Sequence, residues 1–151
     1  MAEQKSTTSS DVQGLIGTLD DYLVKRAPFQ IPDGGKELIV KFGPWISLVL
    51  LVLTLPLLLV ALGLGAIFSP FGGVTAAAGF GITAIFTVVQ VALLVMALPG
   101  LFSRKMSGWT LLFYEQLLSF VHSLLTGSIV GGILGLVIGL YILFQVRGKY
   151  S

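Results

Sequence analysis

Four long apolar segments occupy the carboxyl-terminal two thirds of the chain, and turn-forming residues separate them. No ionisable side chain occurs over residues 42–103, a run too long for one membrane span, because about 20 residues cross a 30 Å hydrocarbon core. A run of turn-forming residues at 69–73 divides it. The resulting segments are residues 45–68, 74–102, 109–125 and 129–146. This pattern predicts an all-α polytopic membrane protein with four transmembrane helices in two hairpins.

An amphipathic helix is predicted ahead of these segments. Apolar residues from Val12 to Leu23 recur at three- and four-residue spacing, which places them on one helix face. Ala27 precedes Pro28, and the residue before proline avoids the α region, so we expect the helix to end there. Its polar face carries acidic as well as basic residues, so two placements stay open: on the membrane surface or against a partner chain. The expected organisation is a polar tail at 1–10, a cytoplasmic amphipathic helix and linker at 11–42, with the turn-rich linker at 32–35, a transmembrane domain at 43–147 and a cytoplasmic tail at 148–151.

Composition agrees with a membrane protein. Of the 151 residues, 55% are hydrophobic and 11% are charged, against about 25% charged in ordinary soluble domains. The mean hydropathy of +0.96 is far above the soluble range. These values exclude a soluble globular domain and a charge-rich nucleic-acid binder. Without cysteine, the chain has no disulfide framework, no thiolate metal site and no cysteine nucleophile.

The placement of the basic residues predicts an orientation. They precede the first segment, lie between the second and third at Arg104 and Lys105, and follow the fourth at Arg147 and Lys149. By the positive-inside rule, both termini and the middle loop are cytoplasmic, most simply at a plasma (inner) membrane. Trp45, Trp109 and Tyr141 near segment ends are expected to be interfacial aromatics. The short third and fourth segments leave an alternative open, a hairpin that enters the bilayer without crossing it, although its tip would leave backbone polar groups in hydrocarbon.

Small residues recur along two helices. Close approach of a neighbouring backbone is possible where Cβ atoms are missing. Two interpretations follow: a seam for self-association, or packing against the other helices of the same chain, which we favour. The helix-packing residues are Gly127, Gly131, Gly135 and Gly139 in the fourth segment, and Gly73, Ala77 and Gly81 at the second.

A few polar residues fall within the apolar segments. Glu115, Ser119 and His122 are spaced four and then three residues apart and therefore share a helix face, and Gln90 is an isolated amide in the second segment. A carboxylate and an imidazole at this spacing could relay protons or bind a cation. Both lie within about 10 Å of a segment end, which favours interfacial or structural roles. One Glu and one His are too few for a metal site, so we expect no metal and no cofactor.

These features favour a non-enzymatic function. The chain contains no nucleophile elbow, zinc-protease, Walker A or dinucleotide-binding motif. A surface helix followed by apolar hairpins resembles the arrangement in membrane-shaping proteins such as reticulons and thylakoid curvature proteins. We expect a structural or accessory subunit of a membrane assembly, or a membrane-shaping protein. Its partners would be the lipid bilayer and other membrane subunits or further copies of itself, not nucleic acid. The alternative is a small oligomeric transporter or channel that uses Glu115 and His122.

Overall fold

The chain folds into helices. The computed structural model describes the backbone of residues 2–151, and the side chains of residues 10–151 apart from 54 and 57. No strand occurs over these residues, as the all-α prediction requires. The α-helices are α1 (Ala2–Asp20), α2 (Asp33–Phe68), α3 (Gly73–Phe102), α4 (Met106–Leu125) and α5 (Ile129–Val146). A π-helix, η1 (Asp21–Lys25), extends α1, and two short 3-10 helices, η2 (Ser69–Gly72) and η3 (Arg147–Lys149), follow α2 and α5.

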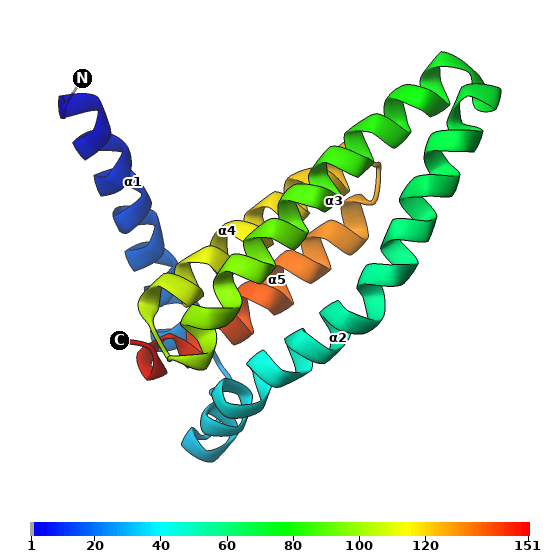
Figure 1. Ribbon diagram of the computed structural model, residues 1–151. Coiled ribbons are helices and arrows are strands. Elements are labelled where there is room, and N and C mark those ends of the chain that lie inside the picture. The colour runs from blue at the N-terminus through cyan, green and yellow to red at the C-terminus, as the bar shows by residue number, and fades with distance from the viewer. Residues whose placement is uncertain (1) are drawn as a thin grey trace.

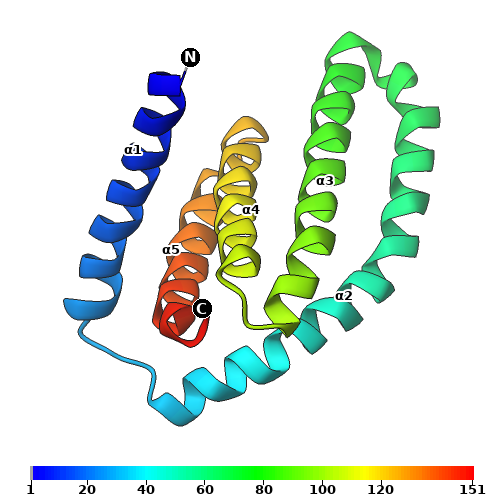
Figure 2. The same cartoon turned by 60° about the vertical axis from the view of Figure 1, so that its left-hand side comes forward.

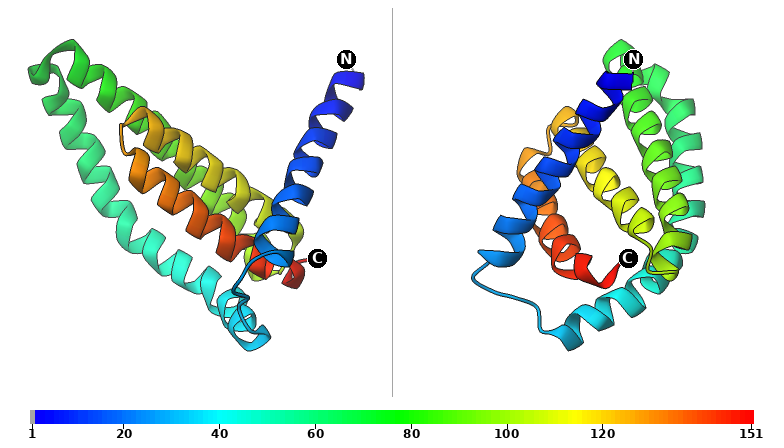
Figure 3. Two further views of the ribbon diagram at one scale, coloured as in Figure 1. Left: turned by 180° about the vertical axis from the view of Figure 1, so that it is seen from behind. Right: turned by 90° about the vertical axis from the view of Figure 1, so that its left-hand side faces the viewer.

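The helices form a bundle that is wider at one end than at the other. Helices α3, α4 and α5 lie side by side, while the long, bent α2 passes below them and meets α3 again at the far end (Figure 1). Figure 2 shows α4 between α3 and α5. Helix α1 approaches the bundle only near its carboxyl-terminal end, and its amino end points away from the other helices (Figure 1, Figure 3). We call the end that holds the start of α2, the α3–α4 loop and residues 147–151 the base, and the opposite end the tip. The α2–α3 turn and the α4–α5 loop both lie toward the tip (Figure 3).

Three helix boundaries differ from the sequence-based expectation. The first turn of α2 contains Asp33 and both following glycines, so most of the expected linker is helical. Helix α2 also continues through Pro44, which lacks an N–H group but does not stop the helix. Helix α1 begins at Ala2, within the expected polar tail, and its helical conformation continues through η1 to Lys25. The apolar face of this amino-terminal helix packs against other helices. These tertiary contacts offset the weak helix propensity of the glycines within it.

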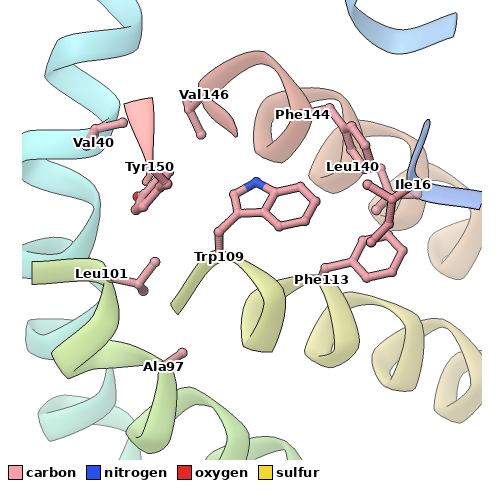
Figure 4. Packing of buried hydrophobic residues seen from close by; sticks show 10 residues of the cluster. All are labelled: Ile16, Val40, Ala97, Leu101, Trp109, Phe113, Leu140, Phe144, Val146 and Tyr150. Carbon is pink, nitrogen blue, oxygen red and sulfur yellow. The ribbon is translucent and has the colours of Figure 1, made fainter. Parts of the chain in front are cut away.

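The buried core lies at the base. Trp109 and Phe113 of α4 and Phe144 of α5 are the largest fully buried side chains among the described residues. The indole of Trp109 stacks on Phe113 at 5.7 Å and meets Phe144 edge-on at 5.2 Å (Figure 4). Ile16 of α1 and Val40 of α2 complete the same cluster. The core therefore draws together helices that are far apart in the sequence.

Apolar surface dominates the rest of the molecule. By length and composition, two helical stretches could cross a membrane: Leu58–Phe102, which includes the α2–α3 turn, and Ile129–Lys149. Only 11% and 33% of their most apolar windows are buried within the chain. A core helix of a soluble protein would be mostly buried, so the exposure of these stretches is compatible with a membrane environment.

Candidate functional site

Ion pairs at the base join basic residues of the α3–α4 loop and of η3 to acidic residues of α1 and α2. Glu37 of α2 accepts a hydrogen bond from Arg104 at 2.5 Å and lies 3.9 Å from the ammonium of Lys149. Arg147 pairs with Asp20 of α1 at 3.2 Å. These side chains are about one third to one half exposed, so each pair contributes at most about 1 kcal/mol. Their main effect is to hold α1, α2, the α3–α4 loop and η3 in one arrangement.

Two side chains of α5 tie the amino-terminal region to the bundle. Gln145, which is 3% exposed, donates a hydrogen bond from Nε2 to the carbonyl of Leu23 at 2.9 Å. Tyr141 donates one from its hydroxyl to the carbonyl of Phe29. Both acceptors are backbone carbonyls near the carboxyl end of η1 or just after it. Carbonyls at the end of a helix have no N–H partner within the helix. These bonds hold η1 and the segment after it against α5, an arrangement that the sequence did not indicate.

Burial and ion pairing shift the pKa values of side chains at the base and on η1. Burial raises the pKa of the Tyr150 phenol above its ordinary value, and the positive charge of Arg104 offsets part of this rise. The phenol is therefore uncharged at neutral pH. On η1, Lys25 lowers the pKa of Asp21, and Asp21 raises that of Lys25, through a 2.7 Å pair. Both groups are ionised at neutral pH, so this polar side of the amino-terminal helix carries balanced charges.

The polar residues expected on one face of α4 lie in two different surroundings. Glu115 lines a cavity of about 220 Å³ between α2, α4 and α5. His122 instead stacks on Phe86 of α3, with ring centroids 5.1 Å apart, and its Nε2 is buried without a hydrogen-bond partner among the described residues. Gln90 of α3 likewise has a buried Nε2 without a partner there, and Ser119 is partly buried. The described residues show no hydrogen bond or ion pair that joins Glu115 to His122.

The glycines of α5 differ in what they face. A Cβ atom added at Gly139 would lie 2.5 Å from the Gln116 side chain, so this position packs against α4. At Gly131 and Gly135, an added Cβ would meet nothing within 4 Å. Gly127 has a positive φ of 77° in the α4–α5 loop, a conformation that glycine adopts at little cost. Gly132, which is not part of the predicted glycine row, makes a close contact between α5 and α4. A Cβ added at Gly132 would lie 2.7 Å from Ser123 Cβ.

The small residues at the start of α3 make no comparable contact. A Cβ added at Gly73 or Gly81 would meet nothing within 4 Å, and Ala77 is only partly buried. Gly73 instead has a positive φ of 81° at the junction with η2. The α2–α3 contact depends on Gly65 of α2, against which the Phe80 ring lies so closely that no Cβ would fit without movement of the ring. Gly65 lies outside the two rows of small residues that the sequence predicts to pack.

The tightest backbone contact joins α3 to α4 at the base. A Cβ at Gly108 would lie 2.5 Å from the carbonyl carbon of Gly100, and a Cβ at Gly100 would lie 2.6 Å from the Gly108 nitrogen. Both glycines are buried. The sign of this contact in the sequence is a glycine on each side of the short basic loop. Trp109 was expected at the interface, but it is 1% exposed, and its Nε1 donates to the carbonyl of Leu143 at 2.7 Å.

The described residues provide packing and ion pairs but no recognisable catalytic centre. No group of three His, Asp or Glu side chains that could hold a metal ion occurs among them. Among the described residues, the Glu115 cavity offers space for a ligand, and many large apolar side chains are exposed on the outer faces of the helices. No protein family, curated protein or solved structure significantly matches the chain.

Proposed function

We propose that the chain is a non-enzymatic integral membrane protein that acts through its shape. In this proposal, four helices cross the bilayer and form a wedge whose broad base lies on the cytoplasmic side. The observation that carries the proposal is the unequal width of the two ends. All five helices approach or enter the base, whereas the outermost part of the tip contains only α2 and α3 (Figure 1).

The helix lengths support the crossings. The part of α2 over residues 45–68 would provide about 36 Å of helix and α3, with 30 residues, about 45 Å, so each is long enough to cross a hydrocarbon core of about 30 Å, with the turn at η2 between them. Helix α5, with 18 residues, provides about 27 Å, and α4, with 20 residues, provides about 30 Å. Since the α3–α4 loop and residues 147–151 both lie at the base, α4 and α5 cross as a pair or not at all.

The charge distribution supports the orientation. Arg104, Lys105, Arg147 and Lys149 all lie at the base, and the turns toward the tip carry no charge. Cytoplasmic loops are enriched in lysine and arginine. The base is therefore assigned to the cytoplasm, together with both termini.

Cysteine labelling tests this topology. The chain has no cysteine of its own, so single cysteines at Ser69, Lys105 and Ser128 can be labelled individually. In intact cells, a membrane-impermeant maleimide should react with cysteines at positions 69 and 128. It should not react with a cysteine at position 105. Ser69 should react faster, because α2 and α3 extend further than α4 and α5. Labelling of Lys105 from outside would contradict the orientation, and a Ser128 position that never reacts would contradict four crossings.

A wedge of this form occupies different areas in the two leaflets of the bilayer. The base occupies more area in the leaflet that surrounds it than the tip occupies in the other leaflet. Lipids around many copies therefore relax by bending the bilayer so that the wider side becomes convex. An amphipathic helix at the same level adds to this effect if it inserts between headgroups.

Reconstitution tests the wedge. We expect vesicles containing the protein to become smaller as the protein-to-lipid ratio rises, with the base on the outer side, measured by electron cryomicroscopy. Ile16→Glu should release α1, because Ile16 is 6% exposed within the base core, and should weaken the effect. Gln13→Glu is the matched control, since Gln13 is exposed on the same helix. Vesicle diameters equal to those obtained with a single-span protein at the same mass ratio would contradict the proposal.

A second candidate function, an accessory subunit, is favoured by the outer face of α5. Gly131 and Gly135 have open space beside them, while the neighbouring Val130 and Leu134 are 72% and 57% exposed. Glycines on a lipid-facing helix permit close approach of another helix. This face would suit a second copy of the chain or another membrane subunit.

Two leucine substitutions separate this candidate from packing within the chain. Gly135→Leu should leave the thermal midpoint of the protein in mild detergent nearly unchanged and reduce the recovered oligomer or complex. Gly132→Leu should instead lower the midpoint, because overpacking typically costs about 1–3 kcal/mol and Ser123 lies in the way. Light scattering with gel filtration measures the assembly. An assembly unaffected by Gly135→Leu would eliminate this face as an interface.

A further inference from the structure

We propose that the cavity between α2, α4 and α5 binds an ammonium group carried on an apolar body. Glu115 would pair with the ammonium, and the apolar wall would hold the body. This site is independent of the wedge, since it depends on the lining of one cavity and not on the outline of the molecule.

The cavity has the size and wall of a site for a small apolar group. Its volume of about 220 Å³ corresponds to about seven water molecules. Residues from α2, α3, α4 and α5 line it, and most of them are aliphatic or glycine. At Gly43 of α2, an added Cβ would meet nothing within 4 Å, so this wall leaves free space. An apolar pocket with a few polar groups is the usual form of a small-molecule site.

The polar groups in the lining favour a cation. The Glu115 carboxylate makes no hydrogen bond or ion pair with any described residue, and no Lys, Arg or His lines the cavity. Gln116 donates its Nε2 hydrogen to the carbonyl of Gly135 at 3.0 Å, which leaves its Oε1 as an acceptor. The Ser47 hydroxyl can accept as well. The lining thus offers several acceptors and one carboxylate without a basic partner, while its neutral donors are the hydroxyls of Ser47 and Tyr150 and the remaining Nε2 hydrogen of Gln116.

An ammonium satisfies this lining better than a neutral or anionic group. A carboxylate away from water requires a charged or hydrogen-bonding partner. A primary ammonium supplies up to three N–H donors and the opposite charge, and such charge-assisted hydrogen bonds are about twice as strong as neutral ones. An anionic ligand would meet the like charge of Glu115, and a purely aliphatic one would leave the acceptors unpaired.

The depth of the cavity allows two sources of the ammonium. Glu115 lies nine residues from the start of α4 at Met106, about 14 Å along the helix from the base. A lipid with an ethanolamine headgroup and a free long-chain amine can both place an ammonium beside apolar chains at this level. The shared chemistry is a primary ammonium next to hydrocarbon, and separate binding measurements distinguish the two sources.

The test compares ligands in which the same nitrogen is either a charged ammonium or a neutral amide. In maltoside micelles, purified protein is titrated with dodecylammonium and with its neutral N-acetyl derivative, and bound ligand is counted by native mass spectrometry. A parallel series uses phosphatidylethanolamine and its N-acetyl derivative. We expect the ammonium form to bind about tenfold more tightly or better in at least one series. A preference in the lipid series alone identifies a membrane lipid, and one in the amine series alone identifies a single-chain amine.

Three variants locate the site. Glu115→Gln keeps the shape of the side chain and should abolish the preference for the ammonium form. Asp33→Asn, which removes an exposed carboxylate of α2 outside the cavity, should leave the preference unchanged. Gly43→Leu should fill the cavity and reduce binding of both forms while Glu115 stays intact.

The proposal is overturned by either of two results. One is equal binding of the charged and neutral forms to the wild-type protein in both series. The other is a preference that persists in Glu115→Gln. If Glu115→Gln fails to fold, as judged by circular dichroism, Gly43→Leu decides: undiminished binding in a folded Gly43→Leu variant places the ligand elsewhere.

Discussion

Gly108→Ala is expected to destabilise the protein more than any other single methyl addition described above. The new Cβ would lie 2.5 Å from both the Gly100 carbonyl carbon and the Leu101 nitrogen, which are backbone atoms and cannot rotate away. Helices α3 and α4 must therefore separate at the base, beside the buried Trp109. Overpacking of this kind costs about 1–3 kcal/mol, and backbone displacement places this variant at the upper end. Unfolding titrations from maltoside into a denaturing detergent measure the loss.

Gly131→Ala is the matched control. It adds the same methyl group to α5, where the Cβ meets nothing within 4 Å. We expect it to be neutral or slightly stabilising, because alanine is the better helix former. Equal unfolding midpoints for the two variants would show that the Gly100–Gly108 contact does not limit stability.

Trp109→Ala should cause the largest loss among core substitutions. The side chain is 1% exposed, contacts two other aromatic rings, and its indole N–H is bonded to Leu143. Truncation of a buried aromatic residue costs about 3–5 kcal/mol. The guanidinium of Arg147, 5.3 Å from the indole ring, also loses its aromatic contact. Because Arg147 pairs with Asp20 of α1, we expect α1 to detach and trypsin to cleave after Lys25 or Arg26 more readily.

Two substitutions show whether this effect is specific. Trp109→Phe keeps a buried ring but loses the N–H donor, so its unfolding midpoint should lie between those of Trp109→Ala and the wild type. Trp45→Ala removes the same side chain from an exposed position on α2, where Trp45 is 58% exposed and contacts the Phe102 ring. Its effect on trypsin cleavage should be small. Equal cleavage of Trp109→Ala and Trp45→Ala would contradict the role assigned to the core at the base.

The apolar periodicity and turn residues were sufficient to predict the helical fold. Both signals are local: apolar runs of about 20 residues favour helix over strand, and Ser69-Pro70 or Thr126-Gly127 interrupts them. The boundaries at the ends of α3 and α5 agree with the structure, at Phe102 and Val146. The start of α2 could not be predicted, because the linker-like Asp33-Gly34-Gly35 is stabilised as a first turn once the helix continues beyond it.

The contacts between helices were less accessible to sequence reasoning. A glycine row identifies a face on which close approach is possible, but not the helix that approaches. Gly131 and Gly135 therefore look equivalent to Gly139 in the sequence, although an added Cβ would clash with α4 only at Gly139 among the three. The Gly100–Gly108 contact depends on the geometry of the α3–α4 loop, where Arg104 has a positive φ of 53°. No pattern of apolar residues encodes that geometry.

The polar residues of α4 illustrate the same limit. Helical spacing predicts that Glu115 and His122 share a helix face, but it cannot state which neighbours surround each turn. Helix α2 leaves a cavity beside Glu115, and α3 brings Phe86 onto His122. The two residues therefore do not form the compact pair that their spacing suggested.

The hydrogen bonds from α5 to the amino-terminal region have a consequence for biosynthesis. Gln145 and Tyr141 bind backbone carbonyls at Leu23 and Phe29, and these partners are 122 and 112 residues apart in sequence. A chain is synthesised from its amino end, so α1 leaves the ribosome long before its docking site exists. During this interval the apolar face around Ile16 lacks the partners on α4 and α5 against which it packs in the folded chain. Docking of α1 therefore depends on the synthesis of α5.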